Sequence, residues 1–182
     1  MGKIICFTGK RPKDMYGYIF RDRYKEMQHI LYRWLRGRTE IDCAITGGAQ
    51  GFDQIAFWTC RDCPWIVKNN LYLPFKGQET KWRKDGLFGQ REYNMMILKA
   101  NEITVCSKLD IETASAKEIS EAYLKRNRDM VNSSDIVFGC FDTKKDFHKD
   151  RSGTAATLRY AEEREKEIWL IDVNNMEAKK YE

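Results

Sequence analysis

The sequence lacks the features that would place it in a membrane or divide it into several domains. No apolar run approaches the roughly 20 residues that a membrane-spanning helix needs. The start, MGKIICFTGK, has no signal-peptide core, and no linker rich in proline, glycine or serine interrupts the 182 residues. Internal repeats and low-complexity tracts are also absent. We therefore expect a single domain over residues 1–182, located in the cytoplasm.

Metal-binding residues are scarce as well. The only histidines are His29 and His148, and only Cys60 and Cys63 form a closely spaced cysteine pair. A zinc site would need a second pair or a nearby histidine, so this pair does not predict a metal or redox centre. The other four cysteines lie in apolar, strand-like runs, at Cys6, Cys43, Cys106 and Cys140. We expect free buried thiols there, and the sequence implies neither a metal nor a cofactor.

A dense basic stripe interleaved with aromatic residues, which would mark a surface for single-stranded nucleic acid, is also missing. The 32 basic and 27 acidic residues give a net charge of +5 that is spread along the chain. This mild excess suits an anionic ligand and does not require nucleic acid.

What the sequence does contain is a regular alternation of short apolar runs and helical patterns. Strands are predicted at residues 3–7, 41–46, 70–75, 102–107, 135–141 and 168–173. Helical patterns are found at residues 88–100, 116–132 and 154–166. Another helix, ending near Gly37, is predicted by the spacing of Met27, Ile30, Leu31, Trp34 and Leu35. This order predicts a three-layer α/β fold with a mostly parallel central sheet flanked by helices. Two loops, at about 108–114 and 143–152, are long enough to cover a ligand.

Glycine follows three of the predicted strands. The three junctions are Thr8-Gly9-Lys10-Arg11-Pro12, Thr46-Gly47-Gly48-Ala49-Gln50-Gly51 and Arg151-Ser152-Gly153-Thr154. Ligands of open parallel sheets bind at the carboxyl ends of the strands, where glycine lets them approach the main chain. Each junction taken alone is also consistent with a tight turn. Ser152 or Thr154 is also consistent with a simple helix cap. Three of them on one sheet edge favour a shared anion site at helix N-termini.

Five motifs in a fixed order connect these junctions to a known family. They are FTGKRP, TGGAQGFDQIA, LPFKGQETKW, YLKRNRDMVNSSD and RSGTAATLRYA. With them the sequence resembles the SLOG superfamily of Rossmann-like nucleotide-binding proteins, and within it the YpsA-like branch. The resemblance implies one Rossmann-like domain that binds a nucleotide or a related phosphate-bearing molecule in a groove. It implies that Gly47, Gly48 and Gly51 line this groove and that Gly153 and Thr154 cradle a phosphate.

The sequence departs from the YpsA-like pattern at two places. Lys10 stands where these proteins usually have histidine, and Arg151 and Ser152 stand where they have a fuller glycine pair. The first change adds a cation and the second removes backbone freedom. The preferred ligand is therefore expected to differ from that of relatives.

Carboxylates decide whether the site is also catalytic. A related branch, the cytokinin-activating phosphoribohydrolases, uses a glutamate in a PGGxGTxxE motif to cleave an N-glycosidic bond. Thr157 occupies the matching position here and cannot act as a carboxylate base. Glu162 and Glu163 read as a solvated helix face. Asp53 remains the candidate catalytic residue, and in that role it would bind a ribose hydroxyl or a water molecule. The alternative is that Asp53 only stabilises its helix by a favourable interaction with the helix dipole.

Cations and amides complete the set of candidate ligand-binding residues. Lys10, Arg11 and Arg126 are candidates to neutralise a phosphate, although a surface arginine is often only solvated. Asn127 is a candidate ligand contact or a tie between loop backbones. Gln78 and Trp82 follow the third strand, where the indole would stack on a base or pack in the core.

Three functions compete on this basis. The first is a sensor or sequestering module for a nucleotide-derived ligand such as ADP-ribose, an NAD derivative or a cyclic nucleotide. The second is a nucleotide N-glycoside hydrolase or phosphoribohydrolase that uses Asp53. The third is binding of single-stranded DNA, as in the related DprA proteins, by the basic residues Lys144, Lys145, Lys149 and Arg151. Because groove-forming folds of this kind often dimerise, we expect a homodimer and no membrane partner.

Overall fold

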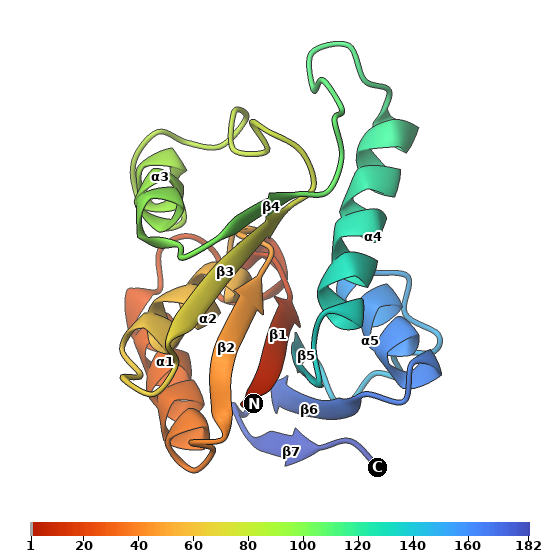
Figure 1. Cartoon of the computed structure of the whole chain (residues 1–182). Helices are drawn as coiled ribbons and strands as arrows, with labels where there is room; N and C mark the ends of the chain where they lie inside the picture. Colours follow the sequence, from red (N-terminus) through yellow and green to blue (C-terminus); the bar gives the residue numbers. More distant parts are fainter. Residues whose placement is uncertain (1) are drawn as a thin grey trace.

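The computed structural model describes residues 2–182, and its strands form one sheet in the order β4-β3-β2-β1-β5-β6-β7 (Figure 1). The strands are β1 (Lys3–Gly9), β2 (Ile41–Thr46), β3 (Lys68–Leu73), β4 (Ile103–Val105), β5 (Ile136–Phe141), β6 (Glu167–Asp172) and β7 (Ala178–Lys180). Neighbouring strands run parallel except β7, which is antiparallel to β6. The predicted fold class, a three-layer Rossmann-like α/β fold with a mostly parallel sheet, is confirmed.

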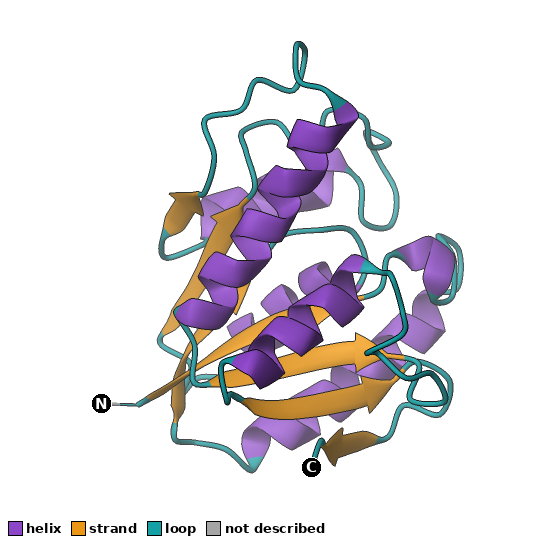
Figure 2. Ribbon diagram, turned by 90° about the vertical axis from the view of Figure 1, so that its right-hand side faces the viewer, coloured by secondary structure: helices purple, strands orange, loops and turns teal. Residues whose placement is uncertain are grey.

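Helices cover both faces of this sheet. They are α1 (Arg21–Arg36), α2 (Phe52–Arg61), α3 (Gln90–Lys99), α4 (Ala116–Asn132) and α5 (Gly153–Glu163), with a short 3₁₀ turn η1 at Pro12–Asp14. The helices α1, α2 and α3 lie on one face, and α4 and α5 lie on the other (Figure 1). Figure 2 shows the second pair in front of the sheet. Parallel strands are joined by right-handed crossovers. From β1 the chain adds β2, β3 and β4 in one direction and β5 and β6 in the other, so the helices that connect the two sets of strands lie on opposite faces of the sheet.

Local signals in the sequence explain where the helices begin and end. α1 buries Tyr24, Met27, Leu31 and Leu35 at spacings of three and four, and its C-cap is the predicted Gly37. α4 begins with a capping box in which Ser115 Oγ accepts from the N–H of Glu118 at 3.3 Å. The Glu118 carboxylate in turn accepts from the N–H of Ser115 at 2.8 Å.

The core lies on both faces of the central strands. β5 is buried throughout, with Phe138 and Cys140 in the cluster beneath α1 and α2. Val137 and Phe141 face the cluster beneath α4 and α5. Because both faces are covered, the strand shows no alternation of apolar and polar residues, which is why its run reads as continuously apolar.

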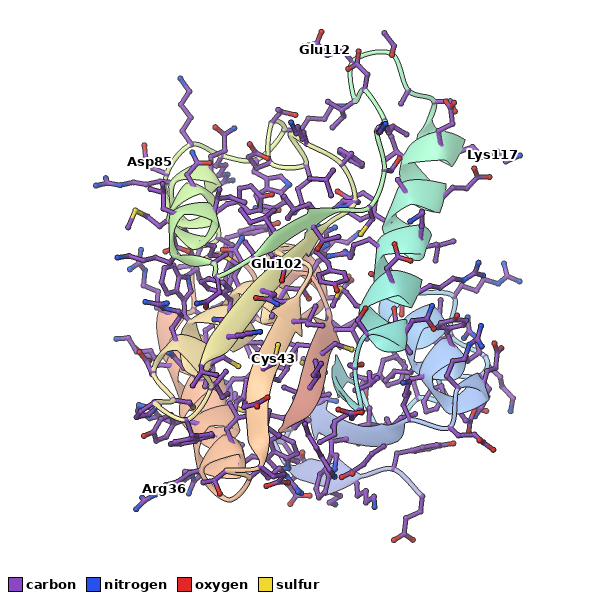
Figure 3. The ribbon with its side chains drawn as sticks, viewed as in Figure 1. Arg36, Cys43, Asp85, Glu102, Glu112 and Lys117 are labelled. Carbon is purple, nitrogen blue, oxygen red and sulfur yellow. The ribbon has the colours of Figure 1, made fainter. Side chains whose placement is uncertain are left out.

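The edges of the sheet differ from the prediction. β7 was not predicted, because the residues AKK carry no apolar pattern; it forms by pairing with Trp169, Leu170 and Ile171 of β6. The strand predicted at residues 102–107 is shorter in the structure, because β4 has only three residues. Cys106 therefore lies just after the strand and is half-buried, whereas a buried thiol within a strand was predicted. The predicted 108–114 loop projects past the sheet with Glu112 at its tip (Figure 3). Within residues 2–182, every helix is too short or too polar to cross a membrane.

Candidate functional site

A cavity of about 360 Å³ opens where β1 and β5 end. The loops after these neighbouring strands diverge toward opposite faces of the sheet, which leaves a crevice at this point. We call it the glycine-loop cavity. It is lined by Phe7, Thr8, Gly9, Lys10, Arg11, Lys13, Asp14, Ala49, Asp53, Tyr123, Arg126, Asn127, Ser152, Gly153 and Thr154. The structure thus brings together the predicted residues of the first junction, the fifth-strand junction and α4.

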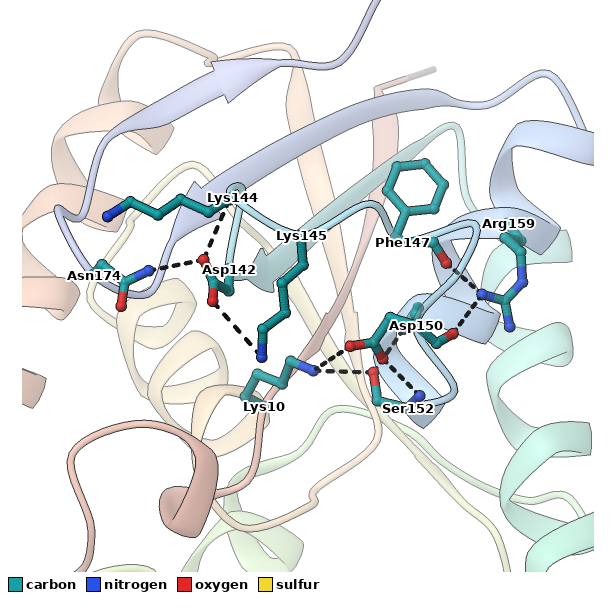
Figure 4. A network of polar contacts seen from close by, with 10 residues as sticks. Lys10, Asp142, Lys144, Lys145, Phe147, Asp150, Ser152, Arg159 and Asn174 are labelled. Carbon is teal, nitrogen blue, oxygen red and sulfur yellow. Dashed lines mark hydrogen bonds and ion pairs between the residues drawn. The ribbon is translucent and has the colours of Figure 1, made fainter.

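Lys10 connects the first junction to the loop that precedes α5 (Figure 4). Its ammonium group donates a hydrogen bond to Ser152 Oγ at 3.0 Å and lies 3.8 Å from Asp150 Oδ2. It also lies 4.7 Å from the ring centroid of Phe141, so the aromatic face supports the cation. The lysine that replaces the expected histidine therefore holds the wall of the cavity together and adds positive charge to it.

The loop between β5 and α5 is fixed by hydrogen bonds near its end (Figure 4). Arg159 donates to the carbonyl oxygen of Asp150 at 2.8 Å and also to that of Phe147. The N–H of Ser152 donates to Asp150 Oδ1 at 2.7 Å. Hydrogen bonding by Ser152 lowers the pKa of Asp150, so this carboxylate is ionised at neutral pH.

The first turn of α5 faces the cavity with unpaired main-chain donors. Ser152 is the N-cap, and its Oγ accepts from the N–H of Ala155 at 3.3 Å. Within residues 2–182, no hydrogen bond engages the N–H of Gly153 or of Thr154. A Cβ added to Gly153 would meet no atom within 4 Å, so the main chain is open to a ligand here. Free amides and the helix dipole together favour an anion at this position.

Arg126 from α4 meets Asp53 from the first turn of α2 at the back of the cavity. Arg126 Nη1 lies 3.5 Å from Asp53 Oδ2, and the two side chains are only 5% and 7% exposed. The N–H of Ala49 also donates to Asp53 Oδ2, at 3.3 Å. Burial raises the pKa of Asp53 against the opposing effect of Arg126, and burial lowers the pKa of Arg126. A guanidinium group remains protonated in proteins, so Arg126 is a buried cation.

The guanidinium of Arg126 has donors without acceptors. In the part of the chain that the structure describes, no hydrogen bond reaches its buried Nε or Nη1. Buried donors without partners are rare because each one costs the hydrogen bonds it made with water. The charged side chains that line the cavity are basic at Lys10, Arg11, Lys13 and Arg126 and acidic at Asp14 and Asp53. Both the free donors and the excess of positive charge suit an anionic ligand.

The second glycine junction reaches the cavity only through Ala49, and its three glycines are not among the lining residues. A Cβ on Gly47 would overlap the guanidinium of Arg126, so glycine makes room for that side chain. Gly51 has a φ of 93° and would place a Cβ 2.6 Å from the carbonyl oxygen of Lys10. Gln78 donates a hydrogen bond to the carbonyl oxygen of Gly47 at 3.2 Å and so stabilises the main chain of this junction. Gly47, Gly48, Gly51 and Gln78 therefore lie outside the cavity lining.

Two further candidates make contacts with the protein itself. Trp82 packs against Tyr93, with ring centroids 5.3 Å apart, in an apolar cluster away from the cavity. Asn127 lines the cavity, and its Nδ2 donates to Thr157 Oγ1 at 2.8 Å. This bond links α4 to α5, whereas the sequence had suggested a link between loop backbones.

Tyr123 and Lys13 are lining residues that the sequence reasoning missed. The guanidinium carbons of Arg11 and Arg126 each lie 5.7 Å from the ring centroid of Tyr123. Tyr123 precedes Arg126 by three positions in α4, so the two side chains share a helix face, and this spacing was a usable signal. Lys13 belongs to the same basic run as Lys10 and Arg11.

Few carboxylates at the cavity are available for chemistry. Asp53 is engaged by Arg126 and Ala49, and Asp14 is the other lining carboxylate. Glu162 lies 3.5 Å from His148 on the surface, so it is not part of the site. Residues 2–182 contain no group of three or more histidine, cysteine or acidic side chains placed to hold a metal ion. The chemistry of these groups suits an anion, and among the described lining residues Asp53 is the buried carboxylate.

A mostly parallel sheet of this strand order, with a cavity where the order reverses, defines a Rossmann-like α/β protein. The chain belongs to the YspA SLOG family, whose model matches residues 5–176, as the motifs had predicted. It is also 34% identical over 128 residues to the uncharacterized SPbeta prophage-derived protein YoqJ of Bacillus subtilis strain 168. The matched segment covers 64% of this chain and 67% of YoqJ. Membership of this family points to a nucleotide-related function.

Proposed function

We propose that the chain binds a nucleotide or a nucleotide-derived molecule in the glycine-loop cavity and acts as a sensor or sequestering module. The observation that carries this proposal is the buried guanidinium of Arg126, whose Nε and Nη1 have no acceptor within residues 2–182. A phosphate in the cavity would supply one, while the free N–H groups of Gly153 and Thr154 would bind its other oxygens. Lys10 and Arg11 would neutralise the remaining charge.

Calorimetry against ADP-ribose, NAD, AMP and cyclic nucleotides tests this function. Arg126→Lys keeps the charge and loses the planar set of donors, so the affinity of any ligand whose phosphate group binds in the cavity should fall about tenfold or more. Arg128→Lys is the matched control, because Arg128 is exposed on the same helix. No heat with any of these ligands, or equal losses in both variants, would contradict the proposal.

A hydrolase that uses Asp53 is the second candidate function. It is supported by the position of Asp53 in the cavity lining and by its burial, which raises the pKa of this carboxyl above its ordinary value, as is common for catalytic acids and bases. Chromatography of each bound nucleotide should then show free base that accumulates with the wild-type chain and not with Asp53→Asn. Saturation of the wild-type protein with no product would remove this candidate.

Binding of single-stranded DNA has less support from the surface. Lys145 lies 3.8 Å from Asp142 and Lys149 lies 3.5 Å from Asp146, so two cations of the basic stretch pair within their own loop. A fall of affinity with salt whose slope matches several phosphates would bring this function forward. The single domain over residues 1–182, the homodimer and the cytoplasmic location stay predictions.

A further inference from the structure

A second and larger cavity, of about 570 Å³, lies between α1, α2 and residues 85–95. We call it the helical cavity. Asp85, on its edge, lies beside α3, on the side of the molecule away from α4 (Figure 3). The first turn of α2 separates it from the glycine-loop cavity, because Asp53 lines one and Gln54 lines the other. The proposed function makes no use of this second cavity.

Gln54 is the unusual residue of the helical cavity. The residue is 1% exposed, and within residues 2–182 neither Nε2 nor Oε1 of its side chain has a hydrogen-bond partner. Other buried amides of this protein have found at least one partner: Asn69 donates to the carbonyl oxygen of Phe57 at 2.8 Å, and Gln78 to that of Gly47. An apolar residue of the same size would avoid the cost of burying an unpaired amide. The unpaired amide therefore indicates a partner that is not part of the chain.

The walls of the helical cavity are aromatic. Tyr24 and Phe88 are almost fully buried and meet edge to face, with centroids 4.9 Å apart. Trp58 is half-buried and follows Gln54 by one helical turn, so both side chains face the same space. Flat apolar walls beside one polar group suit a planar ligand.

The main chain at Phe88 is held in a strained conformation. Its φ is 62°, which is uncommon for a bulky residue other than glycine. Two hydrogen bonds fix it: its N–H donates to Glu92 Oε2 at 2.8 Å, and its carbonyl accepts from Gln50 Nε2 at 2.9 Å. Strain of this kind gathers at ligand-binding segments, where the surrounding structure maintains it.

The rim of the cavity carries more basic than acidic groups. The basic residues are Arg21, Lys25 and Arg91, and the acidic residues are Asp85 and Glu92. The Glu92 carboxylate already accepts a hydrogen bond from the main chain of Phe88. Lys25 lies 3.6 Å from Asp22, which leaves Arg21 and Arg91 against Asp85. This balance favours an anionic substituent on a ligand in the cavity.

We propose that the helical cavity is a second ligand site, for a planar heterocycle whose edge carries an adjacent hydrogen-bond donor and acceptor and which bears an anionic group. Lactam and amidine edges, as found in nucleobases, have this chemistry. The Gln54 amide offers the complementary acceptor and donor. Gln54 lines the cavity, and its amide atoms have no hydrogen bond within residues 2–182 that a ligand would have to replace. Trp58, Tyr24 and Phe88 then contact the ring faces.

Three phosphate-free probes test the site by NMR, with the indole N–H of Trp58 as the reporter. Orotate has a lactam edge and a carboxylate, adenine has an amidine edge without charge, and benzoate has the charge without the edge. We expect orotate to bind most tightly, about tenfold more tightly than benzoate, because a bidentate edge contact gives roughly this discrimination. Gln54→Leu should abolish that difference, while Arg126→Lys should leave it unchanged, which separates this site from the glycine-loop cavity.

Stability of the unliganded chain gives an independent readout. Gln54→Leu removes an unpaired buried amide, so its urea midpoint should equal or exceed that of the wild type. Gln28→Leu is the control, since Gln28 lines the same cavity but its amide already donates to Asp62 at 3.4 Å. Its effect on orotate affinity should be less than about twofold. Gln54→Met provides a second variant of similar shape.

Several outcomes would overturn the proposal. One is no change of the Trp58 signal with any probe at millimolar concentration. Another is equal orotate affinity in the wild type and both Gln54 variants. The third is a response to orotate at Gly153 without one at Trp58, which would move the ligand to the glycine-loop cavity.

Discussion

The two cavities are separated by one helical turn and differ in almost every physical property. The glycine-loop cavity is lined by main-chain amides and charged side chains around the buried pair of Arg126 and Asp53. The helical cavity is lined by aromatic rings and contains a neutral amide, that of Gln54, without a partner. Consecutive residues of α2 thus face two chemically different spaces.

The difference shows that a site is defined by what surrounds a residue and not by its place in a motif. Asp53 and Gln54 belong to the same stretch, TGGAQGFDQIA. Asp53 meets a cation from α4, whereas Gln54 meets α1 and the segment before α3. The first of these surroundings places a buried cation beside the cavity, and the second leaves a neutral amide unpaired.

The largest expected effect comes from breaking the ion pair of the glycine-loop cavity. Arg126→Met leaves Asp53 buried without a compensating charge, and the free energy of unfolding at pH 7 should fall by about 3–5 kcal/mol. Urea titration measures it. The double variant Asp53→Asn/Arg126→Met should recover most of the loss, because no buried charge remains.

An exposed ion pair provides the control for this prediction. Arg23 and Glu26 are 2.9 Å apart but about half exposed, so Glu26→Gln should cost less than about 1 kcal/mol. Similar losses for Arg126→Met and Glu26→Gln would show that burial of the first pair has no energetic consequence.

The second prediction compares Gly153, which lines the glycine-loop cavity, with Gly47, which lies outside its lining. Gly47→Ala should destabilise the chain by about 1–3 kcal/mol and displace Arg126, which lowers nucleotide affinity. Gly153→Ala fills open space, so the stability should change by less than about 1 kcal/mol. Urea titration and calorimetry of both variants measure these effects. A stable Gly47→Ala variant with unchanged affinity would exclude the close packing of Arg126 against the junction.

The third prediction concerns pH and separates Asp53, which lines the glycine-loop cavity, from Asp150, which lies beside Lys10 in the loop before α5. The pKa of Asp150 is below its ordinary value of 3.8, so Asp150 stabilises the fold above that value and this contribution is lost as the pH falls. Asp53 has a raised pKa, so its contribution is greatest at low pH and is lost as the pH rises. Between pH 7 and pH 3, urea midpoints of Asp150→Asn should decline less than those of the wild type. Those of Asp53→Asn should decline more, and parallel curves for all three proteins would contradict both assignments.

The smallest expected effect is at Tyr123, which tests whether the glycine-loop cavity also holds a base. Tyr123→Leu removes an aromatic face beside Arg11 and Arg126, so nucleotide affinity should fall a few-fold, equivalent to about 1 kcal/mol. Calorimetry with inorganic phosphate should show no change, and orotate binding at Trp58 should be unaffected. An equal loss for phosphate and nucleotide would assign Tyr123 to positioning the two arginines.

Much of the fold could be predicted from local patterns. Continuous apolar runs marked β1, β2 and β5, and the spacing of Met27, Leu31 and Leu35 marked the buried face of α1. β7 could not be predicted, because its residues become a strand only by pairing with β6. The location of the candidate cavity at the carboxyl ends of the strands was equally predictable, since parallel strands bring their ends to one edge.

The sequence by itself determined the order of the elements up to β6, the glycine junctions and the candidate cations, because periodicity and backbone freedom are local properties. Only the tertiary structure decided which of these residues meet. It placed Arg126 against Asp53, joined Lys10 to Ser152 across 142 positions, and left the Gln54 amide without a partner. Such contacts depend on how separate helices cross the sheet, and no local pattern encodes that arrangement.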